Sequence, residues 1–269
     1  MEAQAIFDKL WKDYSEQNPS AEKVHDLFVA QGETVENDHI AFRTLDDPRV
    51  NIDVLAKPFI KSGYEEKGNY IFENKHLLAK HFEHKSDGSM PRVFISQLIT
   101  GDFSDFLQET VQSILDQIPS EKLQSDELIH SGRLWEQPSY QTYQKLREES
   151  EYAAWLYVYG FRANHFTVSI NALKKFNDIR QVNRFLKDHG FLMNDSGGEV
   201  KGTPKELLEQ SSIKSEHINV DFQEGIFEIP ACYYEFAKRY EDENGKLYPG
   251  FIAKSADKIF ESTNYYNKK

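Results

Sequence analysis

The amino-acid sequence predicts an α+β fold, and three observations favour that class. Runs typical of strands are grouped apart from runs typical of helices, in the order helices, strands, helices, strands and a short final helix. No glycine-rich turn follows a predicted strand, so dinucleotide-binding and P-loop signatures are absent. No low-complexity linker interrupts the 269 residues, so we expect a single domain, 1–269, with a helical segment at about 1–35 packed on it.

The elements follow from spacing and from helix-ending residues. Residues 2–17 place large apolar side chains at helical intervals, and Ser20 is expected to cap a second helix that ends at Gly32. HIAFRTL alternates and is rich in β-forming residues, which predicts a strand at about 38–44. The later elements are a helix at 50–63, strands at 68–74, 76–84 and 92–99, helices at about 103–117 and 138–158, a strand at 164–170, a helix at 179–190, strands at 217–222 and 225–240, and a short helix at about 255–262.

Composition limits the possible partners and location. A chain with 19 Phe and 14 Tyr has the aromatic content of a packed globular protein, whereas disordered chains are poor in aromatics. A formal net charge of −12 argues against nucleic acid and anionic membranes as partners. The single cysteine, Cys232, allows neither an intramolecular disulfide nor a thiolate cluster, and its apolar neighbours predict a small buried side chain. With no signal-peptide pattern and no apolar run of about 18 residues, we expect a cytoplasmic protein.

The first candidate site residues lie in the predicted strand NDHIAFRT. His39, Ala41 and Arg43 alternate and therefore share one face of the strand. The small Ala41 leaves room for a ligand, and a guanidinium matches the geometry of a carboxylate. The pattern fits a polar cavity as well as it fits an edge-strand histidine beside a surface arginine.

A second histidine opens the polar face of the strand NHFTVSIN. His165, Thr167 and Ser169 share that face, while Phe166 and the other apolar side chains point the opposite way. Taken alone, this pattern is more typical of an ordinary half-exposed strand than of a binding site.

The third candidate lies in IPACYYEFAKRY. Glu235 has aromatic neighbours, and an unpaired carboxylate in such surroundings is costly. It therefore needs a cation, which is either Lys238, Arg239 or a metal ion. Glu228, earlier in the same predicted strand, is the competing acid.

Two imidazoles and one carboxylate from three separate strands match a known ligand set. Non-haem Fe(II) oxygenases use two histidines and a carboxylate, and zinc enzymes use the same side chains, so the residues leave the metal open. The main rival is HLLAKHFEH, where His81 and Glu83 share a face while His76 and His84 do not join them. Such a pair is common by chance, and we interpret it as the polar edge of a strand. No GxSxG elbow supports a serine hydrolase.

Together these segments resemble the 2-oxoadipate dioxygenase/decarboxylase family, also described as the 2-hydroxyglutarate synthases. Each matching segment is short, so their joint order and spacing is the specific signal. The segments span most of the chain and are HIAFR at 39–43, RVFISQL at 92–98, NHFT at 164–167, EFAKR at 235–239 and FIAKSADKIF at 251–260.

The resemblance implies a fold related to the vicinal-oxygen-chelate enzymes, in which a curved, mostly antiparallel sheet with flanking helices encloses a metal. The family's metal ligands carry over to His39, His165 and Glu235, with Fe²⁺ as the cofactor. Its catalytic arginine, which holds substrate and stabilises developing charge, carries over to Arg43. The substrate-binding positions implied are His39, Arg43, His165, Lys254 and Ser255.

The reaction that the resemblance implies is a decarboxylating dioxygenation. It converts 2-oxoadipate and O₂ to 2-hydroxyglutarate and CO₂, a step of lysine catabolism, with the 2-oxo acid and O₂ as small-molecule partners. The chain departs from the family in being shorter and in carrying Lys254 where the family has an apolar residue; this lysine either holds a second carboxylate or faces solvent. The alternatives are a non-redox zinc lyase like the glyoxalases, a zinc hydrolase, or a non-catalytic metal- or ligand-binding module.

Overall fold

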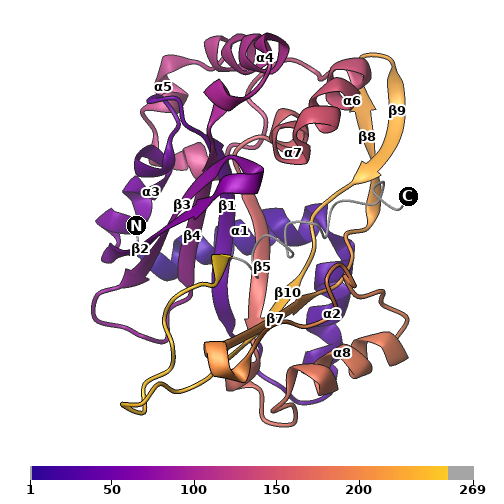
Figure 1. Ribbon diagram of the computed structural model, residues 1–269. Helices are drawn as coiled ribbons and strands as arrows, with labels where there is room; N and C mark the ends of the chain where they lie inside the picture. Colours follow the sequence, from indigo (N-terminus) through magenta and orange to yellow (C-terminus); the bar gives the residue numbers. More distant parts are fainter. Residues whose placement is uncertain (1, 254–269) are drawn as a thin grey trace.

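A curled sheet of eight strands forms the centre of the protein in the computed structural model, which describes residues 2–253 (Figure 1). The strand order is β2-β3-β4-β1-β5-β10-β7-β6, and β8 and β9 form a separate two-stranded ribbon. Neighbours in the large sheet are antiparallel except for the pairs β1–β4 and β5–β10. The strands are β1 Asn37–Leu45, β2 Tyr64–Phe72, β3 Leu77–His84, β4 Arg92–Leu98, β5 Ala163–Ser169, β6 Lys201–Thr203, β7 Leu208–Ser212, β8 His217–Phe222, β9 Gly225–Pro230 and β10 Glu235–Arg239. The prediction of an α+β fold with a mostly antiparallel curved sheet is confirmed.

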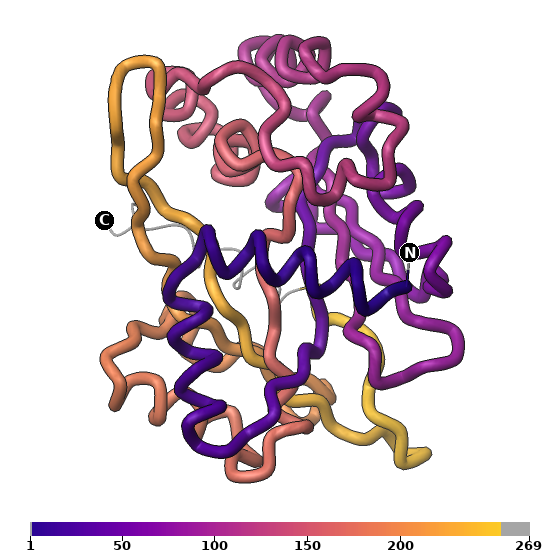
Figure 2. Tube along the Cα trace, turned by 180° about the vertical axis from the view of Figure 1, so that it is seen from behind, coloured from indigo at the N-terminus to yellow at the C-terminus, as the bar shows by residue number. Residues whose placement is uncertain are grey.

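Helices cover the back and both ends of this sheet. The first helix runs across the back of the strands (Figure 2). There Phe166 of β5 packs against Trp11 and Tyr14, with ring centroids 5.2 and 5.0 Å apart. The predicted alternation of β5 is therefore correct, because Phe166 faces the helix and the neighbouring His165 faces the opposite side. The helices are α1 Ala3–Gln17, α2 Pro19–Ala30, α3 Ile52–Lys61, α4 Asp105–Asp116, α5 Ser120–Leu123, α6 Tyr140–Glu149, α7 Glu151–Tyr159 and α8 Ile179–Asp188.

Two of the predicted helix boundaries were wrong. The second helix begins at Pro19, before Ser20, because the fixed backbone angle of proline suits the first helical position. The helix predicted at 138–158 is two helices that meet at Ser150. Ser150 has an extended backbone, and its hydroxyl accepts the N–H of Ala153, so it caps α7 instead of continuing α6.

The strand predictions failed in three places, one of which is the three-residue β6, a strand that was not predicted. The segment predicted as one strand at 225–240 is divided, since β9 ends at Pro230, which has no N–H to donate, and β10 begins at Glu235 in the other sheet. The short β7 was missed because its sequence, LEQSS, is polar although all five residues are buried. The helix predicted at about 255–262 lies outside the described residues.

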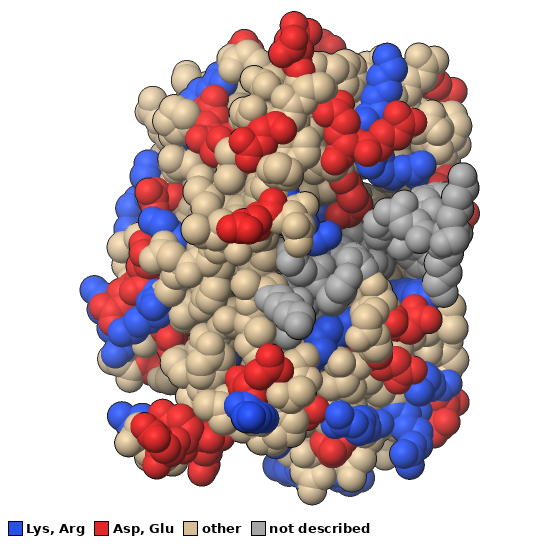
Figure 3. Space-filling view, in the orientation of Figure 1, with Lys and Arg blue, Asp and Glu red and all other residues tan. Residues whose placement is uncertain are grey.

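Two expectations from composition can be compared with the structure. Cys232 is 3% exposed, as predicted, and burial raises the pKa of its thiol to about 12. No helix in residues 2–253 is long and apolar enough to cross a membrane. Figure 3 shows acidic and basic side chains interspersed over one face of the molecule.

Candidate metal centre

The strand register places two of the candidate ligands in one row across the sheet. His39 of β1 pairs with Thr167 of β5, and Thr167 pairs in turn with Glu235 of β10. His39 and Glu235 are thus separated by a single strand, and their side chains reach toward each other over a small threonine. His165 lies two residues along β5 from Thr167, opposite Ala41, and joins the same face.

Two β-bulges between β1 and β5 set the environment of each histidine. The register shifts once at Asp38 and once at Asn164, so each strand has one extra residue directly before its histidine. A bulge re-aims the side chain of the extra residue. As a result, Asp38 Oδ1 lies 2.8 Å from His39 Nδ1, and Asn164 Oδ1 lies 2.9 Å from His165 Nδ1.

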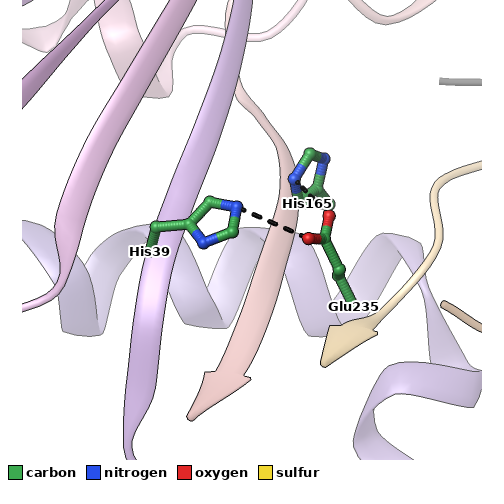
Figure 4. A group of neighbouring side chains, drawn as sticks. All are labelled: His39, His165 and Glu235. Atoms are coloured by element: carbon green, nitrogen blue, oxygen red, sulfur yellow. Dashed lines mark ion pairs between the residues drawn. The ribbon is translucent and has the colours of Figure 1, made fainter. Parts of the chain in front are cut away.

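The three side chains converge on one point in front of the sheet (Figure 4). His165 Nε2 lies 3.1 Å from one oxygen of Glu235, and His39 Nε2 lies 3.8 Å from the other. One candidate ligand atom from each residue lies within 4.8 Å of the other two, and the three form the only such group of His, Cys, Asp or Glu in residues 2–253. Ligand atoms that share an ion at about 2.1 Å are about 3 Å apart, so small movements bring these atoms into coordination distance.

The donor set fits a divalent metal ion. An oxygen of the preceding residue lies at hydrogen-bond distance from each Nδ1, so the tautomer protonated at Nδ1 leaves the Nε2 lone pair for a metal at the shared centre. Gln210 of β7 donates a hydrogen bond to one oxygen of Glu235, which fixes the carboxylate. The hydroxyl of Thr167 lies 3.1 Å from His39 Nε2 on the same face. These contacts orient all three ligands before any ion is considered.

Electrostatics also favour a cation here. All three side chains are at most 5% exposed. Burial works to raise the pKa of Glu235, but His165 and His39 outweigh it, and the pKa is lowered. Burial lowers the pKa of His165, which favours the neutral imidazole that a metal requires. Both shifts favour the forms that metal binding requires, an ionised carboxylate and a neutral imidazole.

Arg43 lies on the same strand as His39 and is 1% exposed. Its guanidinium lies over the rings of Tyr152 and Trp155, at 4.9 and 5.1 Å, and 3.3 Å from Glu151 at the start of α7. Burial works to lower its pKa, but Glu151, Tyr233 and Tyr152 together outweigh burial and the pKa is raised. Arg43 is thus a fixed buried cation on the strand that carries His39.

The rival residues do not belong to this group of three in the described residues. Glu228 is exposed on β9, in the other sheet, so it does not compete with Glu235. His81 Nε2 lies 3.1 Å from Glu83, as their shared face predicted, and its Nδ1 lies 2.8 Å from the hydroxyl of Tyr70. His84 contacts the Tyr64 ring, at 5.3 Å between centroids. The exposed His76 pairs with Asp102.

Several supporting residues escaped the sequence analysis. Asp38 and Asn164 were missed because neighbouring residues of a regular strand point to opposite faces, and only a bulge brings each of them to Nδ1 of the next residue. Gln210 was missed because its strand was missed. Phe251, whose ring lies 4.8 Å from that of His39, is brought there by a loop that no periodicity predicts. Lys254 and Ser255, expected to bind substrate, lie outside the described residues.

Comparison with known proteins gives a consistent family. The family model described as 2-oxoadipate dioxygenase/decarboxylase matches residues 6–246. A chloroplastic/amyloplastic 2-oxoadipate dioxygenase/decarboxylase of Oryza sativa subsp. japonica is 35% identical over 285 residues, covering 96% of this chain and 78% of that protein. The chloroplastic enzyme of Arabidopsis thaliana is 34% identical over 275 residues, covering 93% of this chain and 74% of that protein.

Solved structures agree with this result. The hydroxyglutarate synthase of Oryza sativa in complex with 2-oxoadipate superposes with a TM-score of 0.90 at 32% identity, covering 97% of this chain and 91% of that one. A putative hydrolase from Shewanella frigidimarina gives a TM-score of 0.88 at 50% identity, with coverage of 93% and 97%. A putative glyoxalase superfamily protein from Ralstonia eutropha, 19% identical with a TM-score of 0.73 over 90% of this chain and 83% of that one, shares the fold.

Proposed function

The chain belongs to the 2-oxoadipate dioxygenase/decarboxylase family, and from this premise we propose that it converts a 2-oxo acid and O₂ to a 2-hydroxy acid and CO₂ on an Fe²⁺ centre held by His39, His165 and Glu235. The family makes it an oxygenase, and the metal, the ligand roles and the substrate are the proposal. 2-Oxoadipate is the substrate of choice, because the Oryza sativa hydroxyglutarate synthase was solved with it.

One observation carries the metal assignment. Both imidazoles have Nδ1 held by an oxygen of the preceding residue, and both turn Nε2 toward the same buried carboxylate. Two histidines and one carboxylate that leave other coordination positions open are the ligand set of non-haem Fe(II) oxygenases. When bound, Fe²⁺ supplies a redox-active centre that brings the 2-oxo acid and O₂ together.

The overall reaction balances without a further reductant. 2-Oxoadipate loses its carboxyl group as CO₂, and the adjacent keto carbon becomes the new carboxyl carbon of the product. One oxygen atom of O₂ enters that new carboxyl group and the other becomes the hydroxyl group of 2-hydroxyglutarate, while CO₂ keeps the two oxygens of the lost carboxylate. The protein therefore needs no site for a nicotinamide or flavin, which agrees with the absence of a dinucleotide-binding signature in the sequence.

The protein's own residues supply charge, orientation and exclusion of water. We assign Arg43 to hold a substrate oxygen, because a buried guanidinium matches a carboxylate and stabilises negative charge that develops there. Tyr152 and Trp155 fix the plane of that guanidinium. The ring of Tyr233 stacks on His165 at 4.7 Å, and this apolar cover limits the access of water to the ligand. Lys254 and Ser255 remain proposed substrate contacts.

Anaerobic reconstitution tests the proposal directly. The purified protein is loaded with Fe²⁺ without oxygen and mixed with 2-oxoadipate, and O₂ is then admitted. We expect O₂ uptake, CO₂ and 2-hydroxyglutarate in equal amounts. A panel of 2-oxo acids of different length identifies the preferred substrate, and no O₂ uptake with any of them would exclude the oxygenase reaction.

The same experiment separates the zinc alternatives. Zinc hydrolases also use two histidines and a glutamate, and the 50% identical Shewanella frigidimarina protein is described as a putative hydrolase. A lyase or hydrolase predicts turnover that is independent of O₂ and supported by Zn²⁺. A binding module predicts that metal and ligand bind without turnover.

A further inference from the structure

Arg239 joins a metal-ligating strand to the segment that returns over the centre. Its side chain is 2% exposed and donates four hydrogen bonds. Nε and Nη2 contact the two oxygens of Asp38 at 2.7 and 2.9 Å. Nη1 contacts the carbonyl oxygens of Tyr248 and Gly250 at 2.8 and 2.7 Å. One guanidinium therefore holds a carboxylate on one side and the backbone of a distant loop on the other.

The loop end places an aromatic ring on a candidate ligand. Phe251 follows Gly250 directly, is 6% exposed, and packs edge-on against His39 at 4.8 Å. Its ring also lies 5.1 Å from the Arg239 guanidinium, and its N–H donates to the Tyr70 hydroxyl. We call residues 248–251 the closing segment. In it, the carbonyls are held by Arg239 and the ring covers His39.

Arg239 is also connected to His39 through Asp38. Asp38 Oδ1 accepts from Arg239 Nη2 and lies 2.8 Å from His39 Nδ1. Asp38 is 5% exposed, and both of its oxygens are paired with the guanidinium of Arg239. A carboxylate acceptor held at Nδ1 strengthens the imidazole as a metal ligand. His39 is thus contacted twice through Arg239, once through Asp38 and once through Phe251.

We propose that Arg239 is a positioning residue that couples metal binding at His39 to closure of residues 248–251 over the site. The inference rests on the metal centre of the proposed function. Coupling between two equilibria is reciprocal, so an ion that favours the observed orientation of His39 also favours the closed segment, and by the same factor. A bound metal would thereby further stabilise the cover that Phe251 places over His39.

Arginine is needed for this role because of its shape. A lysine would retain the charge, but its ammonium cannot span two carboxylate oxygens and two carbonyls at once. Arg239→Lys therefore removes the link with little change in charge. Arg49→Lys is the matched control, since Arg49 makes the same two-point contact with Asp47, at 2.8 and 2.9 Å, and a third contact with Asp116, all outside the metal centre.

Hydrogen exchange followed by mass spectrometry measures closure of the segment. Without metal, we expect Arg239→Lys to speed amide exchange in residues 248–251 by about tenfold, the factor that corresponds to about 1.4 kcal/mol. Asp38→Asn should speed it in the same direction, and Arg49→Lys should leave it unchanged. Equal exchange in wild type and Arg239→Lys would overturn the proposal.

Addition of Co²⁺ under anaerobic conditions tests the coupling itself. In the wild type, Co²⁺ should slow exchange in residues 248–251 further. In Arg239→Lys, Co²⁺ should still bind, as its visible absorption shows, but should not slow the segment. Equal slowing in both proteins would show that Arg239 has only a structural role and would overturn the proposal.

The outcome is separable from that of the proposed function. A protein that binds Co²⁺ with the expected coupling but consumes no O₂ with Fe²⁺ refutes the dioxygenase and leaves the role of Arg239 intact. If the wild type binds no Co²⁺, the metal centre fails and the coupling fails with it. The metal-free comparison of Arg239→Lys with Asp38→Asn then decides whether Arg239 holds the segment through Asp38.

Discussion

Replacement of Asn164 by alanine tests whether the residue before each histidine prepares it for metal. Asn164 and His165 are 1% and 4% exposed, and their side chains are joined by a contact of 2.9 Å. Without the amide oxygen, Nδ1 of His165 is left in a buried position with no acceptor from its neighbour. The ring can then rotate or change tautomer, and Nε2 is no longer fixed toward Glu235.

The size of the effect follows from two independent estimates. A buried polar group that loses its hydrogen-bond partner costs about 1–3 kcal/mol. Replacement of a group that orients a metal-bound histidine lowers metal affinity about 10–100-fold, which corresponds to about 1.4–2.7 kcal/mol. The two ranges overlap, so we expect Asn164→Ala to bind Fe²⁺ or Co²⁺ more weakly by about one to two orders of magnitude.

Competition with a chelator of known affinity under anaerobic conditions measures the change. Asn183→Ala is the matched control, because Asn183 is 2% exposed and accepts a hydrogen bond of 2.7 Å from Ser211, in contact with none of the three ligands. It should lower the free energy of unfolding while leaving metal affinity unchanged. A metal affinity of Asn164→Ala within twofold of that of the wild type would contradict this prediction. An equal loss of metal affinity in Asn183→Ala would contradict it as well.

Three further predictions concern charge and ligation. His165→Ala should abolish metal binding, and full metal occupancy measured by elemental analysis would exclude the proposed ligand set. Arg43→Ala should retain the metal but lower kcat by about 10²–10³, the loss typical for a group that stabilises developing charge; unchanged kcat would remove Arg43 from the mechanism. Burial, with a smaller effect of Lys9, lowers the pKa of His130 to about 4. Below about pH 6.5, His130 takes up a proton in the unfolded chain but remains neutral in the folded protein until about pH 4. The free energy of unfolding should therefore fall from pH 7 toward pH 4. Urea unfolding should show a smaller fall in His130→Gln.

The sequence could predict which side chains face the site, but not how they are held. Alternation along β1 and β5 was enough to place His39 and Arg43 on one face and His165 opposite Phe166. The bulges at Asp38 and Asn164 were invisible, because a bulge is a mismatch between two strands and a single strand carries no sign of it. The side-chain oxygens of Asp38 and Asn164 reach Nδ1 of His39 and His165 because of those bulges.

The choice between Glu228 and Glu235 as the candidate ligand depends on strand pairing, which the residue pattern along the chain does not reveal. Glu228 and Glu235 lay in one predicted strand, and only the family resemblance favoured the second. In the structure the chain changes sheets between them, so Glu228 is exposed while Glu235 is 1% exposed beside both histidines. Arg239, a predicted partner of Glu235, is instead bonded to Asp38. Such partner choices depend on strand order, which local sequence does not encode.

Strand direction also explains why the two arginines that follow candidate ligands on β1 and β10 lie at opposite ends of the centre. His39 and Arg43, like Glu235 and Arg239, are four residues apart and so lie on one strand face, about 13 Å apart. β1 is antiparallel to β5, and β5 is parallel to β10, so β1 and β10 run in opposite directions. His39 and Glu235 share the row through Thr167, and the arginines extend away from it on opposite sides. One arginine therefore meets α7, where we place substrate charge, and the other meets the closing segment. The sequence contains both motifs, but only the register turns them into two ends of one site.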